Sequence, residues 1–430
     1  MTDYDAIDFF RGRDLIDDPY GYFDWLRAQC PVHRESHHDV MMVTGYDEAI
    51  AVYNDSNTFS SCNSVTGPFP GFPVPLEGDD VTALIEAHRD ELPFSDQILT
   101  FDPPLHTAHR GLLMRLITPK RLKENEEFMW RLADQQIDEF VERGRCEFIS
   151  DYGQPFALLV IADLLGVPQE DHALFREQLG PRQREHSGTL GGTGDDDRLA
   201  HNPLEFLYEK FTAYVEDRRE NPQQDVLTGL ATATFPDGST PEAIEVARIA
   251  SNVFAAGQET SVRLFGTALR RIAEDRELQA LLDDRRDLIP SYVEECLRFD
   301  SPVKGDFRLA RVTSSVGGVD VPAGTTLMVV NGAANRDPRK FDSATEFEIE
   351  RPNARQHLAF GHGVHTCPGA PLARAEGRIT VERFLDRMRD IRIDDAKHGP
   401  PGQRHYDYVP TYILRGLVRL HLEFTPATAP

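Results

Sequence analysis

The sequence predicts a mainly α-helical protein with small β-sheets, an α+β fold, and three observations support this. The middle of the chain is dominated by segments with helical periodicity. One of these, from Ser239 to about Ile272, is long enough to form a rod of roughly 50 Å. Short apolar strand candidates lie near both ends of the chain, such as Val40–Thr44 and Thr326–Val330. Because so long a rod must cross the core of a large domain, we expect one domain over residues 1–430.

Local signals mark where individual elements begin and end. Gly166 and Pro168 form a normal stop for the helix that precedes them. The segment Ser239-Thr240-Pro241-Glu242 combines a hydroxyl cap, an early proline and an acidic first turn, so we expect the long helix to begin there. Gly317-Gly318 supplies turn chemistry for a two-strand hairpin expected around Val316–Val330.

Charge and cysteine content exclude several classes of protein. The chain has 46 Lys and Arg against 71 Asp and Glu, a formal net charge of −25, which argues against nucleic-acid binding and against an anionic membrane surface. The five cysteines are scattered without a CxxC pair, so neither a disulfide framework nor a clustered zinc or iron–sulfur site is indicated. The charged N-terminus is unlike a secretory signal, and no apolar stretch approaches the ~20 residues of a membrane helix. We therefore expect a cytoplasmic protein.

Small and polar residues interrupt the apolar stripe in the middle of the long helix, at Ala256-Gly257-Gln258-Glu259-Thr260-Ser261. Two interpretations are equally compatible with this pattern. The segment is either a weak point in a packed helix or a helix opened locally so that a planar ligand approaches the backbone at Gly257. In the second case Glu259 and Thr260 would hold protons or water beside that ligand.

The strongest local signal is FGHGVHTCPGAPLARAE, which begins at Phe360. Cys367 follows a glycine-rich turn and precedes Pro368-Gly369 and an amphipathic helix. The first-turn amides and the dipole of that helix favour a thiolate, which is the form that binds a metal. Gly361 and Gly363 would let the backbone pass close to a flat partner, with Phe360 packing on it.

Two other interpretations of this segment are weaker than a haem-thiolate site. A zinc site would use His357, His362, His365 and Cys367, but their spacing matches no common zinc module. A dinucleotide-binding loop would need a third glycine where Thr366 stands. The pattern therefore favours a cysteine that ligates haem iron.

Three short motifs follow one another along the chain: Ala256-Gly-x-Glu-Thr260, Glu295-Cys-Leu-Arg298 and Phe360-x-x-Gly363-x-x-x-Cys367-x-Gly369. In order and spacing they resemble the oxygen-activating helix, the buried Glu-x-x-Arg pair and the haem-binding loop of the cytochrome P450 family, the haem-thiolate monooxygenases. The resemblance extends over roughly residues 18 to 420. It implies the P450 fold, with haem between the long central helix and the helix that follows the cysteine.

The resemblance also implies roles for individual residues around haem b. Cys367 would be the axial thiolate on the iron. The two propionates would be served by His106, Arg110, Arg308 and His365. Further contacts to the haem would come from these positions of the motifs: Ala256, Gly257, Phe360, Gly361 and Gly369.

The reaction is likewise implied by the resemblance. The enzyme would insert one oxygen atom from dioxygen into an apolar organic substrate such as a terpenoid, steroid, branched lipid or aromatic. Thr260 would hydrogen-bond the dioxygen and Glu259 would relay protons, while Glu295 and Arg298 would be structural, together with Arg351. A peroxygenase driven by hydrogen peroxide and a non-catalytic haem-binding protein are the alternatives.

Electrons would have to come from outside, because the chain has no flavin or nicotinamide fingerprint. The expected donor is an acidic ferredoxin with its reductase. Between Asp102 and Lys123 the only acid is Asp102, so the segment is strongly basic. We expect the ferredoxin to dock on it, near Arg115, Lys120, Arg121 and Lys123.

The substrate pocket is less well defined by the sequence. In the family, the Phe- and Pro-rich stretch Cys62–Leu99, together with Val303 and Thr411-Tyr412-Ile413, would cover it, and such walls suit an apolar ligand. Lys304 and Asp306 are unusual charges beside this wall. Of contact with solvent and contact with a polar group of the substrate, we favour solvent.

Overall fold

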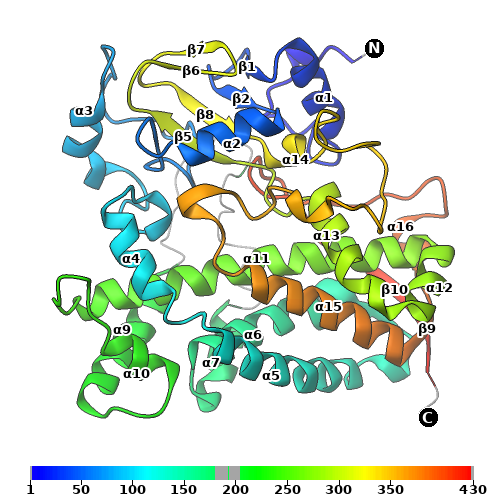
Figure 1. The fold of residues 1–430 in the computed structure, drawn as a ribbon. Helices are drawn as coiled ribbons and strands as arrows, with labels where there is room; N and C mark the ends of the chain where they lie inside the picture. The colour runs from blue at the N-terminus through cyan, green and yellow to red at the C-terminus, as the bar shows by residue number, and fades with distance from the viewer. Residues whose placement is uncertain (1, 180–191, 193–203, 428–430) are drawn as a thin grey trace.

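The longest helix, α11 (Ala243–Glu274), runs through the middle of the molecule with other helices packed along it (Figure 1). This computed structural model describes residues 2–179, 192 and 204–427. The neighbours of α11 include α6 (Gln154–Leu165), α9 (Glu205–Glu220) and α15 (Ala370–Arg387). The predicted central rod is therefore confirmed, and it lies inside the largest apolar core of the described chain.

The start of α11 differs from the prediction. The N-cap is Glu242 rather than Ser239, because the Glu242 and Glu245 side chains each bind the other's backbone amide in a capping box. The end at Glu274 lies close to the expected Ile272. The predicted stop of the preceding core helix is also found, since Gly166 caps α6 in the left-handed conformation, with a φ of 78°.

The remaining helices lie on both sides of α11 in Figure 1, with α5, α7 and α10 below it and α1, α2, α3 and α14 above it. They are α1 (Tyr20–Gln29), α2 (Tyr46–Asn54), α3 (Thr82–Ala87), α4 (Leu105–Leu113), α5 (Pro119–Asp138), α7 (His172–Leu179), α10 (Val226–Ala231), α12 (Arg276–Asp284), α13 (Ile289–Phe299), α14 (Asn331–Ala334) and α16 (Asp395–His398). None of these described helices, nor the others given above, combines the length and the apolar composition that crossing a membrane requires.

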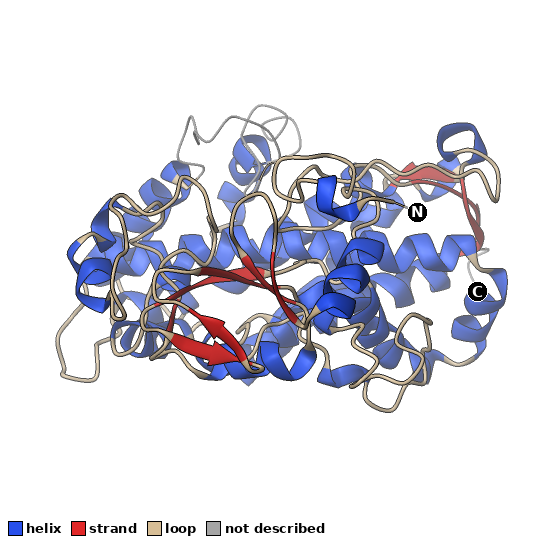
Figure 2. Ribbon diagram, turned by 90° about the horizontal axis from the view of Figure 1, so that it is seen from above, coloured by secondary structure: helices blue, strands red, loops and turns tan. Residues whose placement is uncertain are grey.

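The strands form three small sheets, and Figure 2 shows them in two separate places, one left of the middle of the view and one at the upper right. The largest sheet has the order β1-β2-β8-β5-β3, with β2 and β8 parallel and the other pairs antiparallel. The others are β4-β10-β9 and the hairpin β6-β7. Their bounds are β1 (Val32–Arg34), β2 (Met41–Val43), β3 (Phe59–Ser60), β4 (Arg145–Glu147), β5 (Asp306–Ala310), β6 (Ser314–Val316), β7 (Val319–Val321), β8 (Thr326–Val329), β9 (Met388–Ile393) and β10 (His421–Pro426).

The two predicted terminal strands are confirmed as β2 and β8, which pair directly although they come from opposite ends of the chain. The predicted hairpin is only partly correct. Its turn is at Gly317-Gly318, with φ values of 59° and 82°, but its strands are β6 and β7. The segment after Pro322-Ala323-Gly324 becomes β8 and joins the large sheet, because there it pairs on both sides, with β2 and with β5.

A buried ion pair on α13 ties this helix to the segment that leads to Cys367. Glu295 and Arg298 are fully buried, and the Arg298 Nη2 to Glu295 Oε1 distance is 2.7 Å. Arg298 also donates to the carbonyls of Asn335 and Ala344, and Arg351 Nε lies 3.2 Å from Glu295 Oε1. The structural role expected for Glu295, Arg298 and Arg351 is therefore found, and every charge of the cluster has a partner.

Candidate active site

The turn that carries Cys367 lies between the sheet layer and the helical layer, directly before α15 (Figure 1). The amide of Cys367 donates to the carbonyl of Phe360 at 2.8 Å, which closes the turn. Gly363 has a φ of 68°, and a Cβ atom there would lie 2.3 Å from the carbonyl oxygen of Tyr53 on α2. Only glycine fits at this position, so the turn is clamped against α2.

The sulfur of Cys367 faces the start of α15. A Cβ atom at Gly369 would lie 3.7 Å from Cys367 Sγ. Burial raises the pKa of the Cys367 thiol, although the amides of Gly369 and Ala370 and the charge of Arg110 act in the opposite direction. The predicted effect of the amides is therefore found, but burial outweighs it in the free side chain. A metal cation bound to the sulfur would remove the proton.

Four basic or aromatic nitrogen side chains gather beside Cys367 from three distant segments. His106 and Arg110 are one turn apart on α4, Arg308 lies on β5, and His365 is in the cysteine turn. The rings of His106 and His365 are 3.9 Å apart between centroids, and Arg110 donates to the carbonyl of Thr366 at 2.6 Å. We call these four residues the basic cage.

The basic cage suits a ligand that carries carboxylates. Burial, together with the charge of Arg110, lowers the pKa of His106 to about 4. Burial and the neighbouring Arg308 lower that of His365 to about 2. His106 Nδ1 is buried without a hydrogen-bond partner. The residues thus offer two fixed positive charges and an unused polar atom, which fits the paired propionates of haem.

The centre of α11 presents an opening to this region. Of the residues of α11 that precede its last residue, only Ala256 is exposed, in a helix that is otherwise buried or half-buried. One turn on, the Thr260 hydroxyl donates to the Ala256 carbonyl at 2.8 Å. Glu259 is half-buried, and its Oε2 lies 3.3 Å from Nη2 of Arg263. Ala256 and Thr260 therefore share one face of the helix.

The predicted local opening of the helix backbone is wrong, since α11 is continuous through this segment. The glycine has another explanation. A Cβ atom at Gly257 would lie 3.2 Å from Cδ1 of Ile161 on α6, so the small residue lets the two helices pack closely.

Two buried charged residues next to this site were not anticipated. Arg263 is 6% exposed, and Gly416 packs directly on its side-chain stem. Glu376, on α15, accepts a hydrogen bond from Ser261 Oγ at 2.6 Å, and burial raises its pKa to about 8. The available signal was its spacing, four residues from the buried Leu372 on the apolar face of α15.

A second carboxylate network supports the aromatic side of the cysteine turn. Glu294 accepts hydrogen bonds from His357 Nε2 at 3.1 Å and from Arg374 Nε at 2.6 Å. Although burial acts to raise the Glu294 pKa, these partners lower it to about 2. The Arg374 guanidinium lies 4.7 Å from the centre of the Phe360 ring. His357 is therefore engaged away from Cys367.

The zinc alternative finds no support within the described residues. No group of three or more His, Cys, Asp or Glu side chains there is arranged to hold a metal ion. His362 and His365 lie in the same turn as Cys367, but His365 faces His106 and accepts or donates a hydrogen bond with Ser61 Oγ at 3.1 Å.

The expectation that Lys304 faces solvent is wrong. Lys304 is 4% exposed, and its Nζ donates to the carbonyl of Thr411 at 2.5 Å. Burial lowers the pKa of Lys304 to about 7. Asp306 is half-buried, accepts a hydrogen bond from the Tyr53 hydroxyl at 3.0 Å and lies 3.6 Å from Arg308. Both side chains find protein partners from segments distant in sequence, which take the place of water.

The predicted basic strip is only partly available at the surface. Arg115, Lys120 and Lys123 are exposed, and the Lys120 side chain is 88% exposed. Arg121, in contrast, is 18% exposed and donates to the Leu164 carbonyl and to Asp163. It therefore joins α5 to α6 instead of facing a partner.

Comparison with known proteins gives a consistent result. The family model described as "Cytochrome P450" matches residues 194–393. The cytochrome P450 monooxygenase PikC of Streptomyces venezuelae is 30% identical over 96% of this chain and 92% of its own. Cytochrome P450 144 of Mycobacterium tuberculosis is 29% identical over 97% and 91%. The solved structure of Mycobacterium marinum cytochrome P450 CYP150A6 in the substrate-free form is 54% identical, with a TM-score of 0.92 over 99% of this chain and 100% of that chain.

Replacing Glu376 with Gln tests the buried carboxyl. The folded protein holds Glu376 protonated up to about pH 8, whereas the unfolded chain ionises it near its ordinary value of 4.5. Stability contributed by the protonated form is therefore lost as the pH rises from about 5 to 8. Over this range we expect the free energy of unfolding of Glu376→Gln to rise by several kcal/mol relative to that of the wild type, since each tenfold change in proton affinity is worth about 1.4 kcal/mol.

Urea unfolding at pH 5, 6, 7 and 8 measures this difference. Glu216→Gln, at an exposed position of α9, is the matched control and should show a gap that does not change with pH. A gap between wild type and Glu376→Gln that stays constant from pH 5 to 8 would contradict the assignment.

Proposed function

This chain belongs to the cytochrome P450 family of monooxygenases, and on that premise we propose that it hydroxylates an apolar organic substrate with dioxygen, using electrons from a separate ferredoxin. The family uses a haem-thiolate cofactor. The observation that carries the proposal is the gathering of the basic cage around the turn of Cys367, which leads into α15, and the packing of α15 on α11, the helix of Ala256 and Thr260. One thiol, fixed positive charge and a proton-handling pair suit oxygen activation on haem.

In this proposal the residues of the site divide the work of holding haem b. Cys367 would ligate the iron, and Phe360, Gly361, Gly369, Ala256 and Gly257 would contact the haem. His106, Arg110, Arg308 and His365, which form the basic cage, would receive the propionates. The bound haem supplies dioxygen activation, a chemistry that no side chain offers.

Proton delivery falls to α11. Thr260 Oγ can both donate and accept, and its present donation to the Ala256 carbonyl fixes the position of the hydroxyl. Glu259 is half-buried, so it can exchange protons between solvent and the interior. Arg263 pairs with the Glu259 carboxylate and orients it, which makes Arg263 a positioning residue.

A cavity of about 250 Å³ lies between the segment 89–105 and the first half of α11. Its lining combines the apolar side chains of Ile98, Phe101, Leu105 and Ile249 with the charged ones of Arg89, Asp90, Asp96, Glu245 and Arg248. The apolar part of this lining is the local support for a terpenoid, steroid, branched lipid or aromatic substrate.

Cys367→Ser tests whether the Cys367 sulfur is the ligand of the haem iron. We expect Cys367→Ser to lose the absorption band that thiolate ligation gives the ferrous carbon monoxide complex, because a hydroxyl is a far weaker donor. Cys30→Ser is the matched control, since Cys30 is the other half-buried cysteine of the described chain, and it should keep the band. A retained band in Cys367→Ser would overturn the central assignment.

The acid of α11 distinguishes the monooxygenase from a peroxygenase. We expect Glu259→Gln to lower ferredoxin-driven, dioxygen-dependent turnover by about 100-fold, because positioned proton transfer contributes ~10²–10⁴. Turnover with hydrogen peroxide, which brings its own protons, should be retained. Glu274→Gln, at the exposed end of the same helix, is the control. Equal loss with both oxidants would contradict the relay, and wild-type activity with peroxide alone would favour the peroxygenase.

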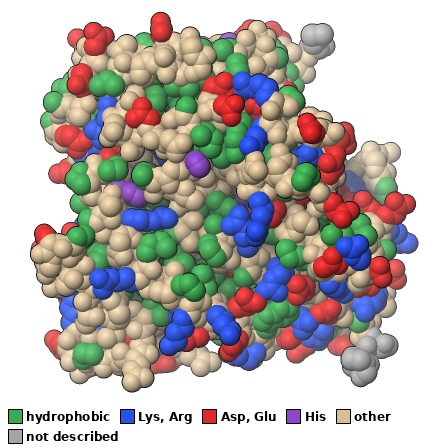
Figure 3. Space-filling view, viewed as in Figure 1, with side chains coloured by type: hydrophobic (Ala, Val, Ile, Leu, Met, Phe, Trp, Pro, Cys, Tyr) green, Lys and Arg blue, Asp and Glu red, His purple; other side chains and the backbone are tan. Residues whose placement is uncertain are grey.

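The proposed ferredoxin surface lies on the face that bears α4, α5 and the cysteine turn. Figure 3 shows Lys and Arg side chains between hydrophobic ones on this face. Met114 and Val364 are each 44% exposed. Arg115, which follows Met114, and Lys120 and Lys123 on α5 are exposed as well. Exposed apolar side chains together with exposed cations suit an acidic electron donor.

Charge reversal at Lys123 tests this surface. We expect Lys123→Glu to slow reduction by an acidic ferredoxin about tenfold at low ionic strength, with the effect fading at high salt because steering is screened. Lys397→Glu, an equal charge change on exposed α16, should have little effect. Substrate binding, followed by the haem spin state, should be unchanged in both. Equal slowing by the two variants would exclude a local docking site.

A further inference from the structure

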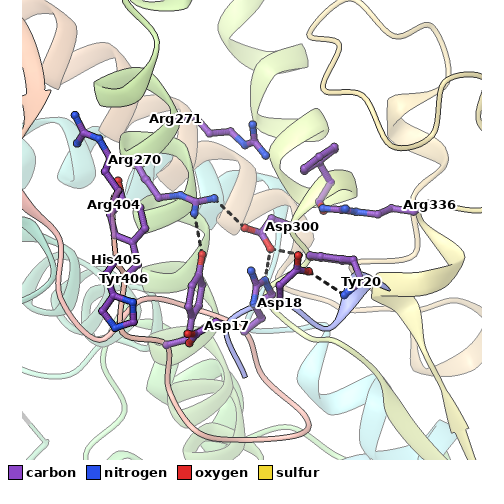
Figure 4. A pocket seen from close by; sticks show the side chains of 13 residues that line it. Asp17, Asp18, Tyr20, Arg270, Arg271, Asp300, Arg336, Arg404, His405 and Tyr406 are labelled. Carbon is purple, nitrogen blue, oxygen red and sulfur yellow. Dashed lines mark hydrogen bonds and ion pairs between the residues drawn. The ribbon is translucent and has the colours of Figure 1, made fainter. Parts of the chain in front are cut away.

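A second polar cavity, of about 380 Å³, lies apart from Cys367 and shares no lining residue with the site around it. It opens between the last turns of α11, the end of α13, the segment before α1 and the loop after α16 (Figure 4). Five arginines line it, which come from four different segments of the chain: Arg270, Arg271, Arg336, Arg404 and Arg415.

The cavity concentrates positive charge in an acidic protein. The lining carboxylates are Asp17, Asp18 and Asp300, so the five guanidinium groups exceed the acids by two, although the whole chain carries a formal charge of −25. Arginine cannot give up its proton at neutral pH. Arg404 has an ion-pair partner outside the lining, Asp395 at 3.2 Å, so one positive charge of the excess is left to be matched by an anion.

Asp300 is already fully engaged. It accepts from Arg415 Nε at 2.5 Å and from the Tyr20 hydroxyl at 2.8 Å, and Arg270 Nη2 lies 3.4 Å away. Burial acts to raise its pKa, but the charges of Arg415, Arg270 and Arg336 hold the pKa well below its ordinary value. Figure 4 shows Asp300 at the middle of the cavity with these partners around it. It has little capacity left for Arg271.

The guanidinium of Arg271 is held by aromatic rings. It lies 4.5 Å from the centre of the Phe299 ring and 4.1 Å from that of Phe347. Within the described part of the chain it makes no hydrogen bond or ion pair, and its Nε is buried without a partner. The guanidinium of Arg336 likewise lies against two rings, 3.8 Å from the centre of Phe299 and 3.3 Å from that of Tyr20.

Further unused donors lie in the same cavity. Nε of Arg270 and Nη1 of Arg404 are also buried without partners. Arg336 donates from Nε and Nη2 to the Phe299 carbonyl, and Arg404 Nη2 lies 3.2 Å from Asp395. The donors left for a ligand are therefore on Arg270, Arg271 and Arg404. The arginines are therefore arranged in advance for an acceptor with several oxygens.

We propose that this cavity binds a small molecule that carries a multiply charged oxyanion group, either phosphate or clustered carboxylates. The guanidinium fork matches both groups in pairs of N–H donors. Such a ligand would join the N-terminal segment, α11 and the loop that leads on to Thr411, so its binding should stabilise the folded protein.

Titration of the haem-loaded protein tests the proposal, because haem then occupies the basic cage beside Cys367 and removes it as a competing anion site. The probes are inorganic pyrophosphate and citrate, each compared with NaCl at equal ionic strength, and the readouts are calorimetric titration and the thermal midpoint. We expect a saturable single-site isotherm and a rising midpoint with at least one probe. Stronger binding of pyrophosphate indicates a phosphate ligand, and stronger binding of citrate a carboxylate ligand.

Variants locate the site. Arg271→Gln should weaken binding about tenfold or more, as expected for the loss of a charge-assisted contact. Arg276→Gln, an equal change at the exposed start of α12, should bind like the wild type. Where Arg271→Gln is too unstable because its stacking is lost, Arg404→Gln makes the same test. No saturable binding beyond NaCl, or equal weakening by Arg276→Gln, would overturn the proposal.

Discussion

The basic cage holds positive charge in a partly buried place beside Cys367, and the surrounding elements must keep its four side chains in position. Arg110 and Arg308 cannot become neutral, and the rings of His106 and His365 are pressed together with their pKa values lowered. Helix α4, strand β5 and the cysteine turn must therefore each be fixed rigidly. The turn is clamped on α2 by the lack of a side chain at Gly363, and the α13 ion pair holds the segment that leads into it.

The central helix α11 provides the other part of the candidate site. It packs against α6, α9 and α15, and before its last residue it is exposed only at Ala256, so the functional face is a small exposed area on a buried helix. On the face toward α15, Ser261 binds the neutral carboxyl of Glu376, and toward the loop near Gly416, Arg263 pairs with Glu259. The charged acid Glu259 and the neutral acid Glu376 thus lie near this exposed area, each with its own partner.

The surface charge of the protein is not uniform, and its exceptions carry the two proposed recognition events. Lys120 and Lys123 are exposed cations of an acidic protein, and the proposal places the approach of an acidic electron donor on their face of the molecule. The arginine-lined cavity around Asp300 is the other exception, and its guanidinium groups are held by stacking and by one saturated carboxylate. In both places partner side chains, more than net charge, decide which cations remain available.

The long central helix, the terminal strands and the cysteine turn followed from the sequence alone, because each depends on periodicity or on residues adjacent in the chain. The burial of the Glu295–Arg298 pair was expected only from the family resemblance, since a pair at this spacing usually lies at the surface. Tertiary structure alone decided which polar groups are free. Arg121 is consumed by carbonyl and carboxylate groups of α6, Lys304 is buried on a carbonyl from the C-terminal region, and Glu376 is neutral beneath α11. Burial and distant partners set these states, and neither is written in the local sequence.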